Sequence, residues 1–338
     1  MDSLENRADG LIVDSSIEDP SKANYLIFAP HAVPAGDMSD ICARIVAQAF
    51  PDGPTKRFLE EDPTADALLK FGLYRADAGA REIAEAFIRM VDEAGATWTL
   101  VRPNPAYALG RGILDFNRPN ERAVGDGGLT LPDQVADEFR ALHATTRAKI
   151  DALFRNMNEL RGVFQPHTMA SGDPDKNAHD ALLEYVKTIP VSPGGLFTDP
   201  EAVGTLFSQW EALYNAMNQG RNRDSICLVN RLHGQPTAPL WTNELALQSL
   251  RESLTQGGFP VAENKPFGHA SGYPGSDLAR GATQRYVPDI TVDVPRFLLA
   301  EDSAASIPLL GFRPDSAKVE VIAGAAFTAF ASVPARNG

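Results

Sequence analysis

The sequence contains few cysteines. Among its 338 residues only Cys42 and Cys227 are cysteines, and no CxxC motif is present. Two cysteines cannot make a disulfide framework, and both stand in apolar runs, which is typical of buried free thiols. Any metal site must therefore use histidines and carboxylates. The same scarcity leads us to expect a reducing, cytoplasmic environment.

Basic residues and long apolar runs are also scarce. The chain has 31 lysines and arginines against 44 aspartates and glutamates, which gives a formal net charge of −13. Nucleic acids and anionic membranes require a basic surface, and no apolar run approaches the ~20 residues of a membrane span. The N-terminal stretch MDSLENRADG also lacks the apolar core of a secretory signal. We therefore expect a small-molecule substrate, neither nucleic acid nor membrane as partner, and a monomer or small homo-oligomer.

The sequence does contain an alternation of apolar strands and amphipathic helices. The clearest helix is 76–95, in which apolar residues recur at helical spacing until Gly95 ends the pattern. Strands are expected at 24–29, 97–101, 112–116, 162–167, 225–230 and 290–299, and helices at 37–50, 76–95, 133–160, 180–187, 200–219 and 243–258. This alternation predicts an α/β fold, a three-layer sandwich with a central mixed, mostly parallel sheet flanked by helices.

The predicted domain organisation is simple. Residues 1–23 precede the first predicted strand, and we expect them to form an N-terminal arm or a peripheral strand. Residues 24–338 are expected to form a single catalytic domain, since one large α/β domain accommodates this length.

Polar residues gather where several predicted strands end. In α/β sheets ligands bind beyond the carboxyl ends of the strands, so such residues are candidate site residues. They are His31, Asp115, Asn117, Arg118, His167, Asp293 and Arg296. Taken singly, each has an ordinary explanation, and Asp77 at the start of the 76–95 helix can be a helix cap. Their coincidence at strand ends is more informative than any one of them.

These residue types match the requirements of a hydrolytic zinc site. Two imidazoles and a carboxylate are typical protein ligands of such a zinc, which keeps a fourth position open for water and lowers the pKa of that water to ~7. A second carboxylate can transfer the proton, and an arginine beside an amide can hold a substrate carboxylate. The sequence lacks HExxH, so this is not the helix-borne zinc site of that motif.

The order of the motifs resembles the N-formylglutamate amidohydrolase family. The motifs are PHAVP, ADAGAREIA, GILDFNRP, QPHTMAS, ENKPFGHASGYPGS and ITVDVPRFLL, and together they span about residues 24–300. LDFNRP and DAGA are the most specific pieces. The resemblance implies a zinc-exopeptidase-like (phosphorylase/hydrolase-like) fold, similar to zinc carboxypeptidases and aspartoacylases, and one Zn²⁺. The segment of about 170–220 is long for the family and is expected to be an inserted helical segment.

The resemblance also implies roles for individual residues. His31 and His167 would be zinc ligands, and Asp77 would be the acidic ligand, with Asp37 and Glu82 as competitors for that role.

The remaining implied roles concern the substrate and the proton. Asn117 and Arg118 would hold the substrate carboxylate, with Asp115 orienting their loop. Asp293 stands where the family has its catalytic glutamate and would act as general base and acid. Arg296 would steer the anionic substrate or pair with a carboxylate, and His269 would be an extra ligand or a substrate contact.

Several positions depart from the family pattern. Ala32-Val33 replaces glycine or serine after the first histidine, and Asp293 is one methylene shorter than glutamate. The expected activity is zinc-dependent hydrolysis of a linear amide, a C–N bond other than a peptide bond. The expected substrate is a small anionic N-acyl amino acid, with N-formylglutamate giving formate and glutamate. The alternatives are a γ-glutamyl or other small peptide amide hydrolase on the same scaffold, or a non-catalytic ligand-binding descendant.

Overall fold

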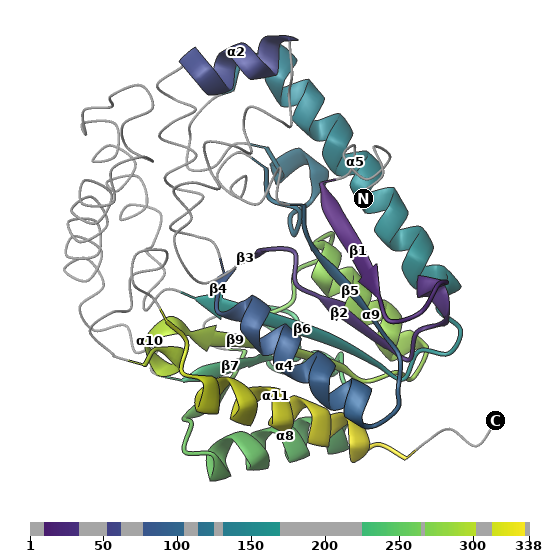
Figure 1. Cartoon of the computed structure of the whole chain (residues 1–338), viewed down its shortest axis with the longest axis vertical. Helices are drawn as coiled ribbons and strands as arrows, with labels where there is room; N and C mark the ends of the chain where they lie inside the picture. Colours follow the sequence, from purple (N-terminus) through teal and green to yellow (C-terminus); the bar gives the residue numbers. More distant parts are fainter. Residues whose placement is uncertain are drawn as a thin grey trace.

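The computed structural model contains a seven-stranded sheet with helices on both faces (Figure 1). Its strands in chain order are β1 (Leu11–Ser15), β2 (Tyr25–Phe28), β5 (Trp98–Pro103), β6 (Gly162–Met169), β7 (Ile226–Val229), β8 (Val261–Glu263) and β9 (Asp289–Pro295). The structure describes residues 10–33, 53–61, 77–104, 114–124, 131–169, 225–264, 268–301 and 313–334. Outside these ranges lie Asp37, the predicted helices 37–50, 180–187 and 200–219, and the predicted insertion.

The strand order is β1-β5-β2-β6-β9-β7-β8. The central strands β5, β2, β6 and β9 run parallel to one another. β1 pairs with β5 in antiparallel fashion, β7 does so with β9, and β8 pairs parallel with β7. The predicted α/β fold, with a mixed sheet between helices, is confirmed. The carboxyl ends of β2, β6 and β9 meet at one edge of the sheet, where ligands are expected.

Helices cover the two faces of this sheet. The helices of the described residues are α2 (Gly53–Glu61), α4 (Ala80–Glu93), α5 (Asp133–Asn156), α8 (Glu244–Gln256), α9 (Pro274–Gln284), α10 (Arg296–Leu299) and α11 (Ser316–Ala331), with short 3₁₀ turns η2 (Pro20–Lys22) and η5 (Asn120–Arg122). Of these, α2 packs on α5. α4, α8 and α11 pack side by side on one face, and α9 lies on the other against β6 and β9 (Figure 1). In the described part of the chain, no helix has the length and apolar character needed to cross a membrane.

An aromatic cluster fixes the central strands against α4. Phe87 of α4 lies with its ring centroid 4.6 Å from that of Phe164 on β6 and 5.8 Å from that of Tyr25 on β2, and Phe330 of α11 lies 5.7 Å from Phe87. Burial of one such side chain stabilises the fold by about 1.5–3 kcal/mol. A side chain at Gly162 would collide with the Phe330 ring, 2.5 Å from the added Cβ. The cluster therefore holds β2 beside β6 and brings their carboxyl ends together.

Three sequence expectations are wrong. The predicted strand 112–116 is represented in the described residues by an isolated bridge between Leu114 and Val124, followed by a turn. The predicted strand 290–299 ends at Pro295, because proline lacks the N–H that would continue the ladder, and α10 follows. Asp77 does not cap α4; the cap is Gly79, which takes the left-handed φ of 92° that glycine tolerates best.

Besides α2 and the short α10, two further helices, α9 and α11, were not expected from the sequence. α9 begins with PGS and is rich in residues typical of loops. α11 contains alanine and other apolar residues on most of its surface, so no helical stripe distinguishes one face from the other. Both helices owe their position to packing, which the sequence pattern does not reveal.

Candidate metal centre

A short parallel pairing brings the first histidine to an acidic partner. Ala32–Val33 forms β3, which pairs with β4 (Asp77–Ala78) in the register Ala32 to Asp77. The Asp77 backbone N–H donates to the His31 carbonyl over 3.1 Å. Ala32 and Val33 therefore form a strand here, which suits a β-branched valine.

Three ligand-type side chains converge near the carboxyl ends of β2 and β6. His167 Nδ1 lies 2.8 Å from Asp77 Oδ2, and His31 Nδ1 lies 3.8 Å from the same oxygen. One ligand atom from each residue lies within 4.8 Å of the other two. A tetrahedral zinc with bonds of about 2.0–2.1 Å separates its ligand atoms by roughly 3.3 Å. The three residues thus form a possible metal site with spacing close to that requirement.

The His31 ring is oriented by a carboxylate on its far side. Nε2–H of His31 donates to Asp115 Oδ1 over 2.6 Å, and both residues are buried. The other ring nitrogen, Nδ1, is the one on the side of Asp77. That Nδ1 is buried and makes no hydrogen bond within the described residues. A carboxylate behind a histidine is the usual second partner of a metal-binding imidazole, so the donor set fits a cation such as zinc.

Asp115 also holds the loop that carries Asn117 and Arg118. Its Oδ1 accepts the Asn117 backbone N–H over 2.9 Å, and its Oδ2 lies 3.2 Å from Arg118 Nε. The Asn117 side-chain oxygen accepts the Gly275 N–H over 2.8 Å at the start of α9. Because Oδ1 is used in this way, the Asn117 NH₂ group is the part of the amide that can donate to a ligand.

Asp293 lies beside His167 in the sheet. The two residues are direct partners in the parallel pairing of β6 with β9, so their side chains leave the same face. Both are half-buried. Arg296 is the first residue of α10 and is buried, with 2% of its surface exposed. Asp293 and Arg296 therefore stand near the same sheet edge as the three ligand-type residues.

His269 is buried and firmly held. Its ring stacks on Trp241 with 5.0 Å between centroids, and its Nδ1 lies 3.3 Å from Ser276 Oγ. Burial lowers the pKa of His269 to about 4, and the nearby His167 acts in the same direction, while the Val229 carbonyl opposes the shift. The imidazole is therefore neutral at neutral pH.

Two predicted candidates stand apart from the three-residue group. Neither His269 nor Glu82 contributes to the cluster of His31, Asp77 and His167 that the described residues form. Glu82 lies in the first turn of α4. Asp37, the other carboxylate considered for the third ligand, is outside the described residues.

A buried polar pair beneath the cluster was missed by the sequence analysis. Gln165, two residues before His167 on the same face of β6, donates through Nε2 to Asp289 Oδ2 over 2.7 Å. The Thr291 hydroxyl donates to the other Asp289 oxygen over 2.7 Å. Burial raises the pKa of Asp289 to about 7, and these two hydrogen bonds oppose the shift. A polar glutamine inside the apolar strand GVFQPH was the one sequence signal of this pair.

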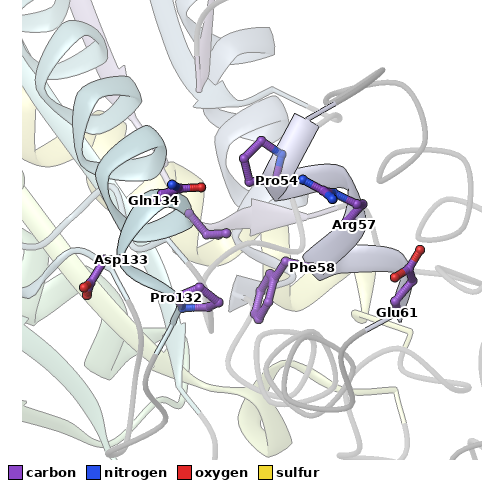
Figure 2. Close-up of a pocket in the computed structure, with 8 residues that line it drawn as sticks. Pro54, Arg57, Phe58, Glu61, Pro132, Asp133 and Gln134 are labelled. Atoms are coloured by element: carbon purple, nitrogen blue, oxygen red, sulfur yellow. The ribbon is translucent and has the colours of Figure 1, made fainter.

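A cleft of about 650 Å³ lies elsewhere, between α2 and the start of α5 (Figure 2). The Thr55 hydroxyl of α2 donates to Glu138 of α5, which ties the two helices together. The cleft contains none of the residues predicted for the site. Its lining residues are Pro54, Arg57, Phe58, Glu61, Pro132, Asp133, Gln134 and Val135.

Comparisons with known proteins give a distant likeness in fold. No family model and no curated protein sequence matches this chain. A solved structure of a gene product from Agrobacterium tumefaciens is 13% identical, covers 97% of this chain and 94% of its own, and superposes with a TM-score of 0.47. An N-formylglutamate amidohydrolase from Ralstonia eutropha is 13% identical, with coverage of 94% and 96% and a TM-score of 0.44. Similarity at this level is too remote to assign the residues of a site.

Proposed function

We propose that the protein is a zinc-dependent hydrolase of the N-acyl amide of an amino acid, with N-formylglutamate, giving formate and glutamate, as the leading substrate. One observation carries the proposal. Within the described residues the buried Nδ1 of His31 makes no hydrogen bond and lies 3.8 Å from Asp77 Oδ2, in a group with His167, while Asp115 binds the opposite edge of the same ring. An unsatisfied buried nitrogen costs about 1–3 kcal/mol, and a bound cation would remove that cost.

The chain's own residues supply the parts of an amide hydrolysis. His31, Asp77 and His167 would hold the zinc. Bound zinc supplies Lewis acidity and lowers the pKa of water to about 7. Asp293, the register partner of His167, takes a proton from the attacking water and passes it to the amine nitrogen as the C–N bond breaks.

The substrate carboxylate would be held by the loop of Asn117 and Arg118. The Arg118 guanidinium is oriented through its Nε by Asp115, and the Asn117 amide is turned by its bond to Gly275. A planar guanidinium beside an NH₂ group suits a carboxylate, and such charge-assisted bonds are about twice as strong as neutral ones. His269 and Arg296 complete the proposed substrate side, and residues 24–338 are proposed to act as one catalytic domain.

Metal analysis followed by a substrate panel tests the proposal. The purified protein should contain about one zinc per chain, as a three-ligand catalytic site predicts. It should release formate from N-formylglutamate faster than it hydrolyses N-acetylaspartate or γ-glutamylglycine. Preference for γ-glutamylglycine would replace the proposed substrate with a small peptide amide. Bound zinc without turnover of any compound would indicate a ligand-binding descendant, and absence of zinc would overturn the proposal.

A further inference from the structure

A continuous series of hydrogen bonds runs from the buried carboxyl beneath the site to the first zinc ligand. We call it the Asp289–His31 chain, and its members in order are Asp289, Gln165, Gly275, Asn117, Asp115 and His31. It starts on β9, crosses β6, passes through the first turn of α9 and ends in the loop behind the metal cluster. It therefore connects the interior of the sheet with both the metal side and the substrate side of the site.

The first half of the chain fixes α9 to the sheet. Gln165 Nε2 donates to Asp289 Oδ2 over 2.7 Å and to the Gly275 carbonyl over 2.9 Å. Both hydrogens of this NH₂ group are then used, so the amide has one orientation. Gln165 and Asp289 are each almost completely buried. The position of the first turn of α9 thus depends on the side chain of Gln165 and on its anchor Asp289.

The second half fixes the site loop to α9. The Gly275 N–H donates to Asn117 Oδ1 over 2.8 Å, and the Asn117 N–H donates to Asp115 Oδ1 over 2.9 Å. The same Asp115 oxygen accepts the proton of His31 Nε2 over 2.6 Å. A displacement of Gly275 would therefore reach both the Asn117 amide and the His31 ring.

Gly275 is the one link that admits no side chain. A Cβ at this position would lie 2.5 Å from Gln165 Oε1 and 3.1 Å from Asn117 Oδ1. Both contacts are closer than ordinary van der Waals distance, and the groups that would have to move are the chain members themselves. The close approach of α9 to Gln165 and Asn117 thus explains why residue 275 is a glycine.

We propose that the Asp289–His31 chain positions Asn117 and His31 for the reaction, and that Asp289 is a positioning residue that anchors it. The proposal rests on the proposed function for the roles of Asn117 and His31. Hydrogen bonds in series inside a protein polarise one another, so loss of the anchor weakens links further along the chain. An ionised Asp289 accepts a stronger hydrogen bond from Gln165 than a neutral carboxyl does.

The charge on Asp289 changes within the working pH range. Its pKa of about 7 results from burial, and the groups that face its carboxyl are Gln165 from β6 and Thr291 from β9. The Thr242 hydroxyl donates to its backbone carbonyl from the loop before α8. Because ionisation strengthens the bond to Gln165, the chain should hold Asn117 more tightly above neutral pH than below it.

Kinetics of three variants test the chain. Asp289→Leu removes the acceptor, so KM for N-formylglutamate should rise by about tenfold, the effect of one buried hydrogen bond, with a smaller change in kcat. Asp289→Asn keeps a hydrogen-bond acceptor but removes the charge, so its KM should resemble that of the wild type with Asp289 protonated. The KM of the wild type should decrease between about pH 6 and about pH 8, and that of Asp289→Asn should not. The control Thr283→Val removes a hydroxyl bond from α9 to Ala279 outside the chain and should leave KM unchanged.

A spectroscopic readout makes the test independent of activity. The side-chain amide NMR signal of Asn117, assigned with Asn117→Ser, should shift as the wild type passes neutral pH and should not shift in Asp289→Asn. Folded Asp289→Leu and Asp289→Asn proteins with wild-type KM, and an Asn117 signal insensitive to pH, would overturn the positioning role. If the wild type lacked zinc and turnover while the Asn117 signal still changed with the ionisation of Asp289, the proposed function would be wrong. The positioning role of the Asp289–His31 chain for Asn117 would still be supported.

Discussion

Two regions of the molecule are very different candidates for a binding site. One is the cluster of His31, Asp77 and His167, and the other is the cleft between α2 and α5. The cleft has a volume of about 650 Å³, and Arg57, Glu61 and Asp133, the charged residues that line it, are exposed to solvent (Figure 2). The cluster is compact, and His31 and Asp77 are at most 5% exposed. The cluster favours chemistry, because a reaction needs groups held in fixed positions and Asp115 holds the His31 ring there.

The difference also concerns stability. Exposed charges along the cleft keep their water, so an empty cleft costs little. Burial of His31 Nδ1 without a hydrogen bond from the described residues costs about 1–3 kcal/mol in the folded protein. A fold retains such a cost where function requires it, which makes the buried cluster the stronger candidate and gives experiments that can separate the two regions.

Removal of both histidines should have the largest effect. The double substitution His31→Ala and His167→Ala leaves one proposed ligand, so zinc should be lost and kcat/KM should fall by at least about 10³-fold. Elemental analysis and kinetics measure the two effects. The matched double substitution in the cleft, Arg57→Ala with Glu61→Ala, should retain zinc and activity. Full zinc content in the histidine variant would rule out the cluster as the metal site.

The strand ends could be read from the sequence because strand periodicity and ligand chemistry are local properties. NYLIFAPH and GVFQPH each predict a buried strand that ends near a histidine, and parallel packing brings the two ends together. Asp77 could be proposed only by its order along the chain, since its place depends on the pairing of β3 with β4. The position of the two histidines was thus predictable, whereas the third member required the fold.

The polar groups beneath the site could not be predicted in the same way. Gln165 and Asp289 acquire their roles through Gly275, and the helix that starts there has a loop-like sequence. Asp115 was expected to orient its own loop, and its contact with His31 spans 84 positions of sequence. Periodicity does not report such long-range hydrogen bonds. The supporting groups of a site are therefore the part that sequence reading misses most readily.

The buried groups should also make the stability of the fold depend on pH. Asp289 has a pKa near 7 in the folded protein against 3.8 ordinarily, so the folded state binds the extra proton. Its contribution to stability should be lost as pH rises from about 4 to about 7, by up to about 4 kcal/mol. His269, with a pKa lowered from 6.5 to about 4, acts with opposite sign, because stability is gained as pH rises through that interval.

Urea unfolding of the wild type and Asp289→Asn across pH isolates the Asp289 contribution. As pH increases toward 7, the free energy of unfolding of the wild type should decrease relative to that of Asp289→Asn. Above that pH the difference between the two proteins should level off. The exposed Asp133 of the cleft provides the control, since Asp133→Asn should give a curve parallel to that of the wild type. Parallel curves for Asp289→Asn and wild type would contradict the raised pKa.

Loss of Arg118 should have a smaller effect, confined to substrate binding. Arg118→Ala removes a charge-assisted bond of about 1.5–3 kcal/mol, so KM for N-formylglutamate should rise by about 10–100-fold while zinc content is retained. Arg122 lies in η5 of the same loop region and is exposed, so Arg122→Ala is the matched loss of charge. Equal increases in KM for both variants would show that the substrate is attracted by the overall electrostatic potential of this region, and not by a specific bond to Arg118.

Neutralisation of Asp115 should have the smallest effect of the four. Asp115→Asn keeps the shape of the side chain but weakens its hold on His31 Nε2, and loss of such a supporting partner typically costs about tenfold or somewhat more in metal affinity. Competition with a zinc chelator measures the change, and Asp133→Asn in the cleft again serves as the control. Because Asp115 also binds the Asn117 N–H and Arg118, KM should increase together with the zinc dissociation constant. An increase in KM with unchanged zinc affinity would mean that Asp115 holds only the loop of Asn117 and Arg118. The case for the cluster over the cleft would then depend on His31, Asp77 and His167 alone, without a supporting carboxylate.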